Sequence, residues 1–334
     1  MKHRLTIACL FMAGLSSLAA QTPGSVSSKL AGIQRFTVPA ASSRPIGVNF
    51  VRPPLAAGRM DSRTSTTFTD NQVNFGTLLA GKSNLWLELT NGNYRGMATP
   101  VTVASANTLN TEDSLVPYAP GAAVFEVREA HTVATLFGAT NTAGLHPSTT
   151  LNLSGNPDEI HIPDGAGGYH RVFYSTPAGG WRQDGDEISD ASGIPIYHVD
   201  AVIIHRKQAS ALTLSFVGFV RSTPTYFPVI TGTTTIFNAA YPTGTTLTSS
   251  GLATQVKQGT ELTADIISIP NSSGGWDACY YATASPPSIS AGWKQVGQGN
   301  TDKGTVPWAS TFRIERRGVT ANVKLLPGPS YSGL

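Results

Sequence analysis

An internal duplication constrains the fold of this 334-residue chain more than any other sequence feature. Residues 157–176, PDEIHIPDGAGGYHRVFYST, align without gaps to residues 264–283, ADIISIPNSSGGWDACYYAT, and eight of the twenty positions are identical. Further matches follow in the same order: TLFGA (135–139) with TIFNA (235–239), Gly-Trp at Trp181 and Trp293, and IIHRK (203–207) with RIERR (313–317). A unit of about a hundred residues is repeated, and each copy is expected to adopt the same fold.

The repeated segment has the pattern of a β-hairpin. Ile160 and Ile162 alternate with His161, so the two isoleucines share one face of a strand and the histidine lies on the other. The Pro-x-x-x-Gly-Gly stretch predicts a turn, and YHRVFY (169–174) is the returning strand. Turn signals recur along the chain and long helical periodicity is absent. We therefore predict an all-β fold of tandem small β-sandwich or β-barrel modules with an internal duplication.

The position of the duplication divides the chain. An N-terminal module is expected before the two copies, with a strand at residues 85–89, where leucines alternate with Trp86 and Glu88. Strong strands are expected at 211–220 and 321–326, and the segments TLFGA and TIFNA are each expected to begin a short helical turn. The predicted boundaries are a signal peptide (1–20), a linker (21–33), an N-terminal β-module (34–128), repeat A (129–222), repeat B (223–327) and a tail (328–334).

The N-terminal residues have the pattern of a secretory signal peptide. A basic start, Met1 to Arg4, precedes an apolar run from Leu5 to Leu18, and Ala19-Ala20 supplies small residues for cleavage. This run is too short for an ordinary transmembrane helix, and no later stretch reaches 18 consecutive apolar residues. We expect an exported protein without a transmembrane anchor, located extracellularly, in the periplasm or at the outer surface.

Composition excludes some partners. Charged residues make up 13% of the chain, and the net charge of +3 is spread without basic clusters, which argues against nucleic-acid binding. Cys279 is the only cysteine outside the predicted signal peptide, so no intramolecular disulfide is expected. The modules must then be stabilised by their hydrophobic cores.

His161, Asp164 and His170 lie within ten residues and raise the question of a metal or catalytic site. The second copy has other residues at these three positions, namely Ser268, Asn271 and Asp277. The scaffold residues of the hairpin persist in both copies, whereas these side chains do not. The pattern therefore favours a solvated hairpin face over a metal site confined to the first copy.

The acidic stretch DGDEISD suggests two kinds of chemistry. Ca²⁺ binds six to eight oxygen ligands, and closely spaced carboxylates in a loop could supply some of them. The weak metal candidates are Asp184, Asp186, Glu187 and Asp190. Asp184 and Glu187 could also be a glycosidase pair, but that reaction needs carboxylates on opposite sides of a cleft. A solvated acidic turn is the favoured interpretation, and no cofactor other than Ca²⁺ is suggested.

Four aromatic residues at turn edges are the weak ligand-binding candidates. Trp181 and Trp293 each follow glycine at equivalent positions, and Tyr169 and Trp276 each follow Gly-Gly. Such rings could stack on sugar rings. The favoured alternative is that they cap the core at the ends of the hairpins, because large rings stabilise a fold by their burial.

The order of these motifs carries a resemblance. Three segments come first: VNFVRPPLAAG (48–58), LELTNGNYRGMATPVTVASANTL (87–109) and PGAAVFEVREAHTVATLFG (120–138). The repeat motifs then follow in a fixed order, which is Leu-Phe, Asp-x-Ile-x-Ile-Pro, Gly-Gly-aromatic, Tyr-Tyr, Gly-Trp, Val-Pro and Ile-x-Arg-Arg. In this order the chain resembles an uncharacterised family of secreted, paralogous, repeat-containing proteins of verrucomicrobial bacteria. The family has no established activity, so the resemblance implies no catalytic residue, ligand or cofactor.

Motifs of common enzyme classes are absent from the sequence. It contains no G-x-S-x-G, H-E-x-x-H, P-loop or dinucleotide fingerprint, so no catalytic residue is assigned. We expect a non-catalytic structural or adhesive protein of the cell envelope or exterior, with a cell-surface polymer or glycan as partner. The alternative is a carbohydrate-binding or carbohydrate-degrading secreted protein that uses the four aromatic residues and the acidic loop.

Overall fold

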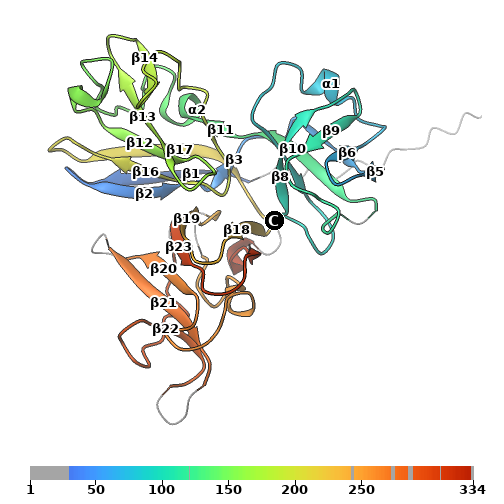
Figure 1. Ribbon diagram of the computed structural model, residues 1–334, viewed down its shortest axis with the longest axis vertical. Coiled ribbons are helices and arrows are strands. Elements are labelled where there is room, and N and C mark those ends of the chain that lie inside the picture. Colours follow the sequence, from blue (N-terminus) through green and yellow to red (C-terminus); the bar gives the residue numbers. More distant parts are fainter. Residues whose placement is uncertain are drawn as a thin grey trace, which may run out of the picture.

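The computed structural model describes residues 30–119, 121–241, 244–271, 275–284, 289–308 and 310–331. The predicted signal peptide and residues 21–29 of the predicted linker lie outside these ranges. Nearly all regular structure is β-strand, and the named strands pair in antiparallel sheets arranged as three modules (Figure 1). The prediction of an all-β fold of several modules is confirmed.

The second copy of the repeat, copy B, is continuous in sequence. It consists of a five-stranded sheet in the order β19-β23-β20-β21-β22 and a two-stranded ladder of β18 and β24. Large apolar side chains, among them Phe227, Ile267 and Phe312, form the core of this module. Its elements are β18 (Thr225–Val229), β19 (Thr234–Asn238), η2 (Leu252–Thr254), β20 (Ile266–Pro270), β21 (Trp276–Ala282), β22 (Gly292–Gln295), β23 (Thr311–Glu315), β24 (Ala321–Leu325) and η3 (Pro329–Tyr331).

The first copy, copy A, has the same arrangement of sheets. Its five-stranded sheet has the order β14-β13-β12-β16-β2, and β1, β17 and β3 form the smaller sheet. The registers agree as well, since Ile160 pairs with Val172 and the equivalent Ile267 pairs with Cys279. Its elements are β1 (Ala31–Val38), β2 (Ser43–Gly47), β3 (Phe50–Val51), β11 (His131–Thr132), α2 (Val133–Phe137), η1 (Leu153–Gly155), β12 (Glu159–Pro163), β13 (Tyr169–Ser175), β14 (Gly180–Gln183), β15 (Pro195–Ile196), β16 (Ala201–His205) and β17 (Leu212–Val220).

Copy A is interrupted by an inserted module, which the predicted boundaries did not anticipate. Strand β1 pairs with β17 as β18 pairs with β24, and β2 pairs with β16 as β19 pairs with β23. Residues 31–51, which the sequence had placed in the linker and the N-terminal module, therefore complete copy A. The chain then leaves this copy, forms the inserted module, and returns at β11. Strand pairing of this kind joins segments far apart in sequence, so local patterns do not reveal it.

The structure also corrects one of the matched segments. TLFGA overlaps helix α2, as predicted, whereas TIFNA begins as strand β19 and does not form a helical turn. The true counterpart of the α2 start is Thr246 with Ser249, whose side chains and backbone amides bond reciprocally at 2.9 and 3.1 Å. Thr132 and Thr135 make the same reciprocal capping box at the start of α2.

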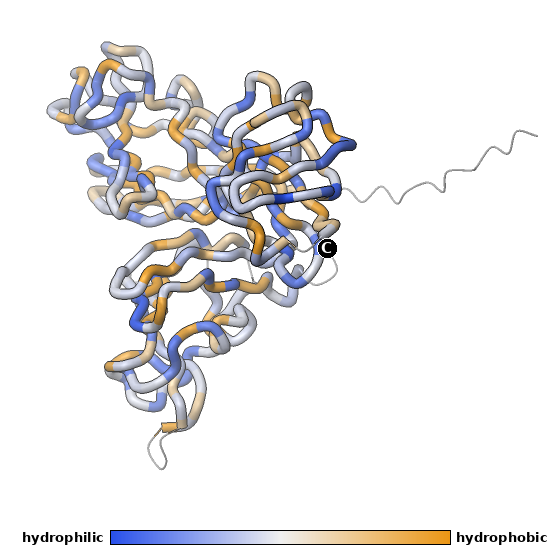
Figure 2. The backbone as a smooth tube through the Cα atoms, turned by 45° about the vertical axis from the view of Figure 1, so that its right-hand side comes forward, coloured by the Kyte–Doolittle hydropathy of each residue, from blue (hydrophilic) through white to orange (hydrophobic). Residues whose placement is uncertain are grey.

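The inserted module contains a seven-stranded sheet in the order β4-β10-β7-β8-β9-β6-β5. The predicted alternation in β7 is confirmed, because Leu85, Leu87 and Leu89 join the core of this module. Figure 2 shows hydrophobic and hydrophilic segments interleaved along its strands. Its elements are β4 (Ala56–Arg59), β5 (Ser62–Arg63), β6 (Thr67–Thr69), α1 (Phe75–Leu78), β7 (Leu85–Leu89), β8 (Ala98–Val103), β9 (Thr108–Thr111) and β10 (Val124–Glu129).

The two copies meet where their large sheets end, at β2 and β19. The Asn238 side chain donates to the Val48 carbonyl at 2.7 Å, and the Asn49 side chain donates to the Tyr241 carbonyl at 3.0 Å. In the predicted tail, Tyr331 is buried against Tyr241. Within the part of the chain that the structure describes, no helix has the length and hydropathy needed to cross a membrane.

Candidate functional site

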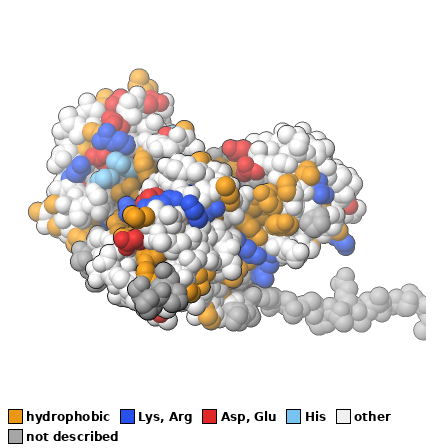
Figure 3. Space-filling view, turned by 60° about the horizontal axis from the view of Figure 1, so that its bottom comes forward, with side chains coloured by type: hydrophobic (Ala, Val, Ile, Leu, Met, Phe, Trp, Pro, Cys, Tyr) orange, Lys and Arg blue, Asp and Glu red, His pale blue; other side chains and the backbone are white. Residues whose placement is uncertain are grey.

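The outer face of the copy A sheet gathers more ionisable side chains than its inner face. We call this group the histidine face; it consists of His161 and Glu159 on β12, Arg171 on β13, His205 on β16, and Lys207 just beyond β16. Cross-strand pairing brings them together, since His161 lies opposite Arg171 and Glu159 lies opposite His205. Figure 3 shows histidine side chains beside basic and acidic ones on this part of the surface.

Glu159 is at the centre of the histidine face. Its carboxylate accepts hydrogen bonds from His161 Nε2 at 2.9 Å, from Arg171 Nη2 at 3.0 Å and from Lys207 Nζ at 3.1 Å. The bond from His161, followed by those from Arg171 and Lys207, holds the pKa of the Glu159 carboxyl far below its usual range. Glu159 is therefore a charged acceptor that fixes its neighbours, and it is unsuited to donate a proton.

His205 supplies a neutral ring next to His161. The centroids of the two rings are 4.0 Å apart, and His205 Nδ1 bonds to the Ser43 hydroxyl at 2.6 Å. Burial, followed by the charge on His161, lowers the pKa of His205 to about 4. The imidazole is therefore uncharged at neutral pH, and its Nε2 is buried without a partner among the described residues.

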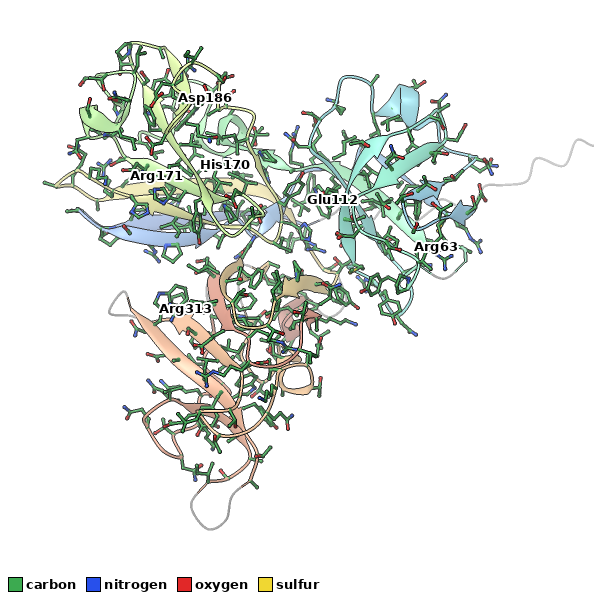
Figure 4. All side chains as sticks on the ribbon, viewed as in Figure 1. Arg63, Glu112, His170, Arg171, Asp186 and Arg313 are labelled. Carbon is green, nitrogen blue, oxygen red and sulfur yellow. The ribbon has the colours of Figure 1, made fainter. Side chains whose placement is uncertain are left out.

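Charged and aromatic groups surround this centre. Arg171 bonds to Asp184 at 2.7 Å, with the two side chains 43% and 34% exposed. Tyr169 is 42% exposed, and the centroid of its ring lies 6.1 Å from that of His161. Figure 4 locates Arg171 on the copy A sheet, with Asp186 in the loop beyond it. Because its charges are paired with one another, this face is suited to hydrogen bonding with a polar surface rather than to proton transfer.

The less favoured alternative, a site formed by His161, Asp164 and His170, is not found among the described residues. Asp164 Oδ1 caps the hairpin turn by accepting from the amides of Ala166 and Gly168, each at 2.8 Å, and these bonds lower its pKa. His170 pairs with Ile162, whose side chain lies in the core, so it lies on the opposite face from His161. The hypothesis of a site formed by these three side chains is therefore wrong, as the substitutions in the second copy had indicated.

The four acidic candidates for Ca²⁺ bond to nearby groups instead of converging. Asp184 pairs with Arg171, and the Glu187 carboxylate accepts from the amide of Gly185. Asp186 accepts from the amide of Ser189 at 3.1 Å, and Asp190 accepts from the amide and hydroxyl of Ser192. In the described residues, no group of three or more His, Cys, Asp or Glu side chains is arranged to hold a metal ion.

Trp181 and Trp293 are core residues. Their exposed fractions are 0% and 2%, and each ring makes an edge contact with the tyrosine opposite it, Tyr174 or Tyr281, at 5.3 and 5.4 Å. The burial of both rings agrees with the favoured interpretation that they cap the core, and it leaves no stacking surface on either ring. The reason is register, since pairing with a core-facing tyrosine turns each tryptophan inward.

The other two aromatic candidates lie at the surface. Tyr169 borders the histidine face, and Trp276 begins the equivalent strand of copy B. Trp276 is only partly exposed, and the Arg313 guanidinium lies over its ring at 5.2 Å from the centroid. These two rings remain accessible, but among the described residues no second tyrosine, tryptophan or phenylalanine ring lies against either of them.

Copy B lacks the histidine face. The positions of Glu159, His161, Arg171 and His205 are occupied by Ile266, Ser268, Ala278 and Glu315, as the strand registers show. Ile266 instead belongs to a small apolar cluster with Tyr280 and Ala282. His205 was missed in the sequence because it lies 44 positions after His161. A signal was available in the sequence. If the strands at 203–207 and 159–163 are expected to pair, His205 and Lys207 fall on one face of the sheet, near Glu159.

A second polar group, which we call the junction, is buried where the modules meet. Glu88 on β7 bonds to Arg221 at 2.7 Å and to Arg128 at 3.4 Å, and it also accepts from Thr223. All three charged side chains are almost fully buried. Although burial opposes ionisation of Glu88, Arg221 and Arg128 overcome that effect and lower its pKa. The signal in the sequence was a glutamate within an otherwise apolar strand.

Trp86 connects this charged group to copy A. Its ring stacks on His198 with centroids 4.3 Å apart and planes 18° from parallel. The guanidinium groups of Arg128 and Arg221 lie 5.6 and 5.8 Å from the centroid of the Trp86 ring. Burial, followed by the charges on Arg221 and Arg128, lowers the pKa of His198 well below its usual value. The ring is therefore neutral, and the junction joins the inserted module, copy A and the segment that leads into copy B.

We compared the chain with protein-family models, with curated proteins and with solved structures, and none of the three comparisons finds a match.

Proposed function

We propose that the protein is an exported, non-catalytic structural or adhesive protein of the cell envelope or exterior. The observation that carries this proposal is the buried junction around Glu88, which joins the inserted module to copy A and to the segment that leads into copy B. Ion pairs in a low-dielectric interior require fixed geometry, because a displaced partner leaves a buried charge uncompensated. A coupled three-module body suits a protein whose task is to hold a surface in place.

The histidine face is the contact surface in this proposal. It is confined to copy A, whereas the scaffold is common to both copies. The side chains of Arg171, Asp184 and Lys207 are 43%, 34% and 36% exposed. They offer hydrogen-bond donors and acceptors to a polar polymer. The signal-peptide pattern of residues 1–20 and the resemblance to secreted proteins support the location.

Binding to cell envelopes tests the proposal. Protein without residues 1–20 would be incubated with envelope preparations of the source organism, and bound protein would be measured after sedimentation. We expect saturable binding that Arg171→Ala together with Lys207→Ala weakens about tenfold. Lys82→Ala, an exposed cation of the inserted module, is the matched control and should bind like the unaltered protein. Equal binding by the double variant, or no binding at all, would contradict the proposal.

Carbohydrate binding is the second candidate function. The observation that favours it is the exposed Tyr169 ring beside the charged groups of the histidine face, because sugar sites combine an aromatic surface with polar groups. A glycan array would be probed with and without Ca²⁺. Binding that Tyr169→Ala abolishes, while Trp276→Ala leaves it unchanged, would favour this candidate and locate the site in copy A.

A further inference from the structure

An open surface pocket of about 530 Å³ lies beside the end of β23 in copy B. Its lining residues include the apolar Val256, which is 7% exposed, and Val319, which is 78% exposed, together with the cationic Lys257 and Arg316. Ligand pockets commonly combine an apolar lining with a few polar groups that fix orientation. The pocket has the composition expected for a ligand that carries a negative charge next to an apolar group.

Arg316 is held rigidly in the wall of this pocket. Arg316 is 4% exposed. Its Nη1 pairs with the Asp265 carboxylate, and its Nε donates to the Val319 carbonyl at 2.7 Å. Asp265 is in turn fixed by the amides of Arg317 and Gly318, at 2.7 and 2.8 Å. A guanidinium fixed in this way loses little side-chain freedom when it binds a ligand.

The equivalent ion pair of copy A shows what is different in copy B. Arg206 pairs with Asp158, and its Nε and Nη2 both bond to Ser210, to the carbonyl at 2.9 Å and the hydroxyl at 3.2 Å. Val319 occupies the position of Ser210 in copy B and has no hydroxyl. Within the described residues, nothing accepts a hydrogen bond from Arg316 Nη2. A donor in a nearly buried side chain is therefore open on the side of Val319, which is 78% exposed.

The surrounding charges leave this donor in a positive environment. Asp265 offsets the charge of Arg316, and Glu315 pairs with Arg317 at 2.8 Å. Lys257 Nζ contacts the Arg317 carbonyl at 3.5 Å, and no carboxylate of the described residues forms an ion pair with it. A Cβ placed on Gly318 would lie 3.1 Å from Arg316 Cζ and 3.2 Å from Lys257 Cβ, which locates both cationic residues beside Gly318.

We propose that this pocket binds a carboxylate attached to a short apolar chain. One carboxylate oxygen accepts from Arg316 Nη2, Lys257 supplies the neighbouring positive charge, and the apolar chain packs on Val256 and Val319. A fatty acid and the C-terminus of a peptide that ends in apolar residues share this chemistry. The site is independent of the histidine face, which lies in the other copy.

Isothermal titration calorimetry at low ionic strength tests the proposal on the protein without residues 1–20. The probes are hexanoate and N-acetyl-Val-Leu with a free C-terminus, and their uncharged counterparts are hexan-1-ol and the dipeptide amide. Val319→Ser restores the hydroxyl found in copy A and is expected to weaken the binding of the acids about tenfold, because a hydrogen bond to a charged group is lost. Lys257→Ala is expected to weaken it by a similar factor.

Ser210→Val in copy A is the matched control, and it should leave the affinity within a factor of two. Binding of either acid with this dependence supports the site, and the acid that binds more tightly identifies the source of the carboxylate. Binding of the alcohol or amide as tightly as the acids would overturn the proposal. Absence of binding, or unchanged affinity of the Val319→Ser protein, would overturn it as well. Because Val319 is exposed, the variant is expected to fold, which circular dichroism checks.

Discussion

Gly47 of copy A lies against Asn238 of copy B, and the two residues occupy the same position in the duplicated fold. Gly47 pairs with Ala201 on β16, and Asn238 pairs with the equivalent Thr311 on β23. A Cβ at residue 47 would lie 2.4 Å from the Asn238 Oδ1 and 2.1 Å from the Ser310 carbonyl oxygen. The contact between the copies thus requires a glycine in one copy and an amide side chain in the other.

Gly47→Ala is expected to destabilise the protein by about 1–3 kcal/mol, because the added methyl group overlaps backbone atoms that cannot easily move. Urea denaturation measures this loss. Gly193→Ala is the control, since a Cβ there meets nothing within 4 Å. A stability of Gly47→Ala equal to that of this control would mean that the two copies separate without cost.

The buried ion pairs Asp158–Arg206 and Asp265–Arg316 are expected to be equally important to the two copies. Both aspartates are 0% exposed, so Asp158→Asn or Asp265→Asn leaves a buried arginine without its counter-charge. We expect each change to cost about 3–5 kcal/mol. Hydrogen exchange followed by mass spectrometry should show lost protection in the altered copy. Asp186→Asn, in an exposed loop, should leave protection unchanged in both copies.

Glu88→Gln is expected to loosen the arrangement of the modules. The change leaves the buried Arg221 without its counter-charge and leaves Arg128 with Glu126 as its remaining carboxylate partner, which opposes close packing of the two arginines. Small-angle X-ray scattering should then report a larger radius of gyration. Glu126→Gln is the control, because Glu126 pairs with Arg128 nearer the surface. An unchanged radius for Glu88→Gln would contradict the coupling of the modules on which the proposed function rests.

Ile267→Asp is expected to unfold copy B, because the side chain is fully buried in its core. His161→Ala is expected to cost about 0.5–1 kcal/mol, since Arg171 and Lys207 still hold Glu159. Thermal unfolding monitored by circular dichroism compares the two variants. A loss for His161→Ala as large as that for Ile267→Asp would mean that the histidine face is part of the structural core.

The stability of the protein is expected to fall as the pH drops from about 6.5 to about 4. Burial lowers the pKa of His131 to about 4, the pKa of His205 is also about 4, and that of His198 is well below its usual value. In this range the unfolded chain takes up protons at these three histidines and the native protein does not, which favours unfolding. Asp200 acts in the opposite direction, because desolvation raises its pKa to about 7 and the native protein holds that proton.

His131→Phe isolates one of these contributions. The His131 ring is largely buried and a contact with the Phe50 backbone is its one polar interaction named among the described residues, so an apolar ring should be tolerated. The pH slope of the free energy of unfolding should decrease by up to about 1.4 kcal/mol per pH unit between pH 4.5 and 6. Urea denaturation across this range measures the slope. A slope equal to that of the unaltered protein would show that His131 does not titrate differently in the native and unfolded states.

Local sequence patterns were sufficient for the individual elements. The alternation of Ile160 and Ile162 with His161 placed two side chains in the core and one on the outer face, as observed. The alternation in β7 located Leu85, Leu87 and Leu89 in the core, but it did not reveal that Trp86 and Glu88 on the other face are also buried. The reason is that strand geometry sends successive side chains to opposite faces, so a core face is visible over five residues.

The sequence by itself determined that this is an all-β chain with a duplicated hairpin, because those properties follow from neighbouring residues. Only the tertiary structure decided that β1 and β2 belong to copy A, that Trp181 faces inward, and that His161 meets His205. Each of these depends on which distant strands pair and in which register. A shift of register by one residue would reverse every side chain of a strand, and the residues of one strand do not specify the register of its partner.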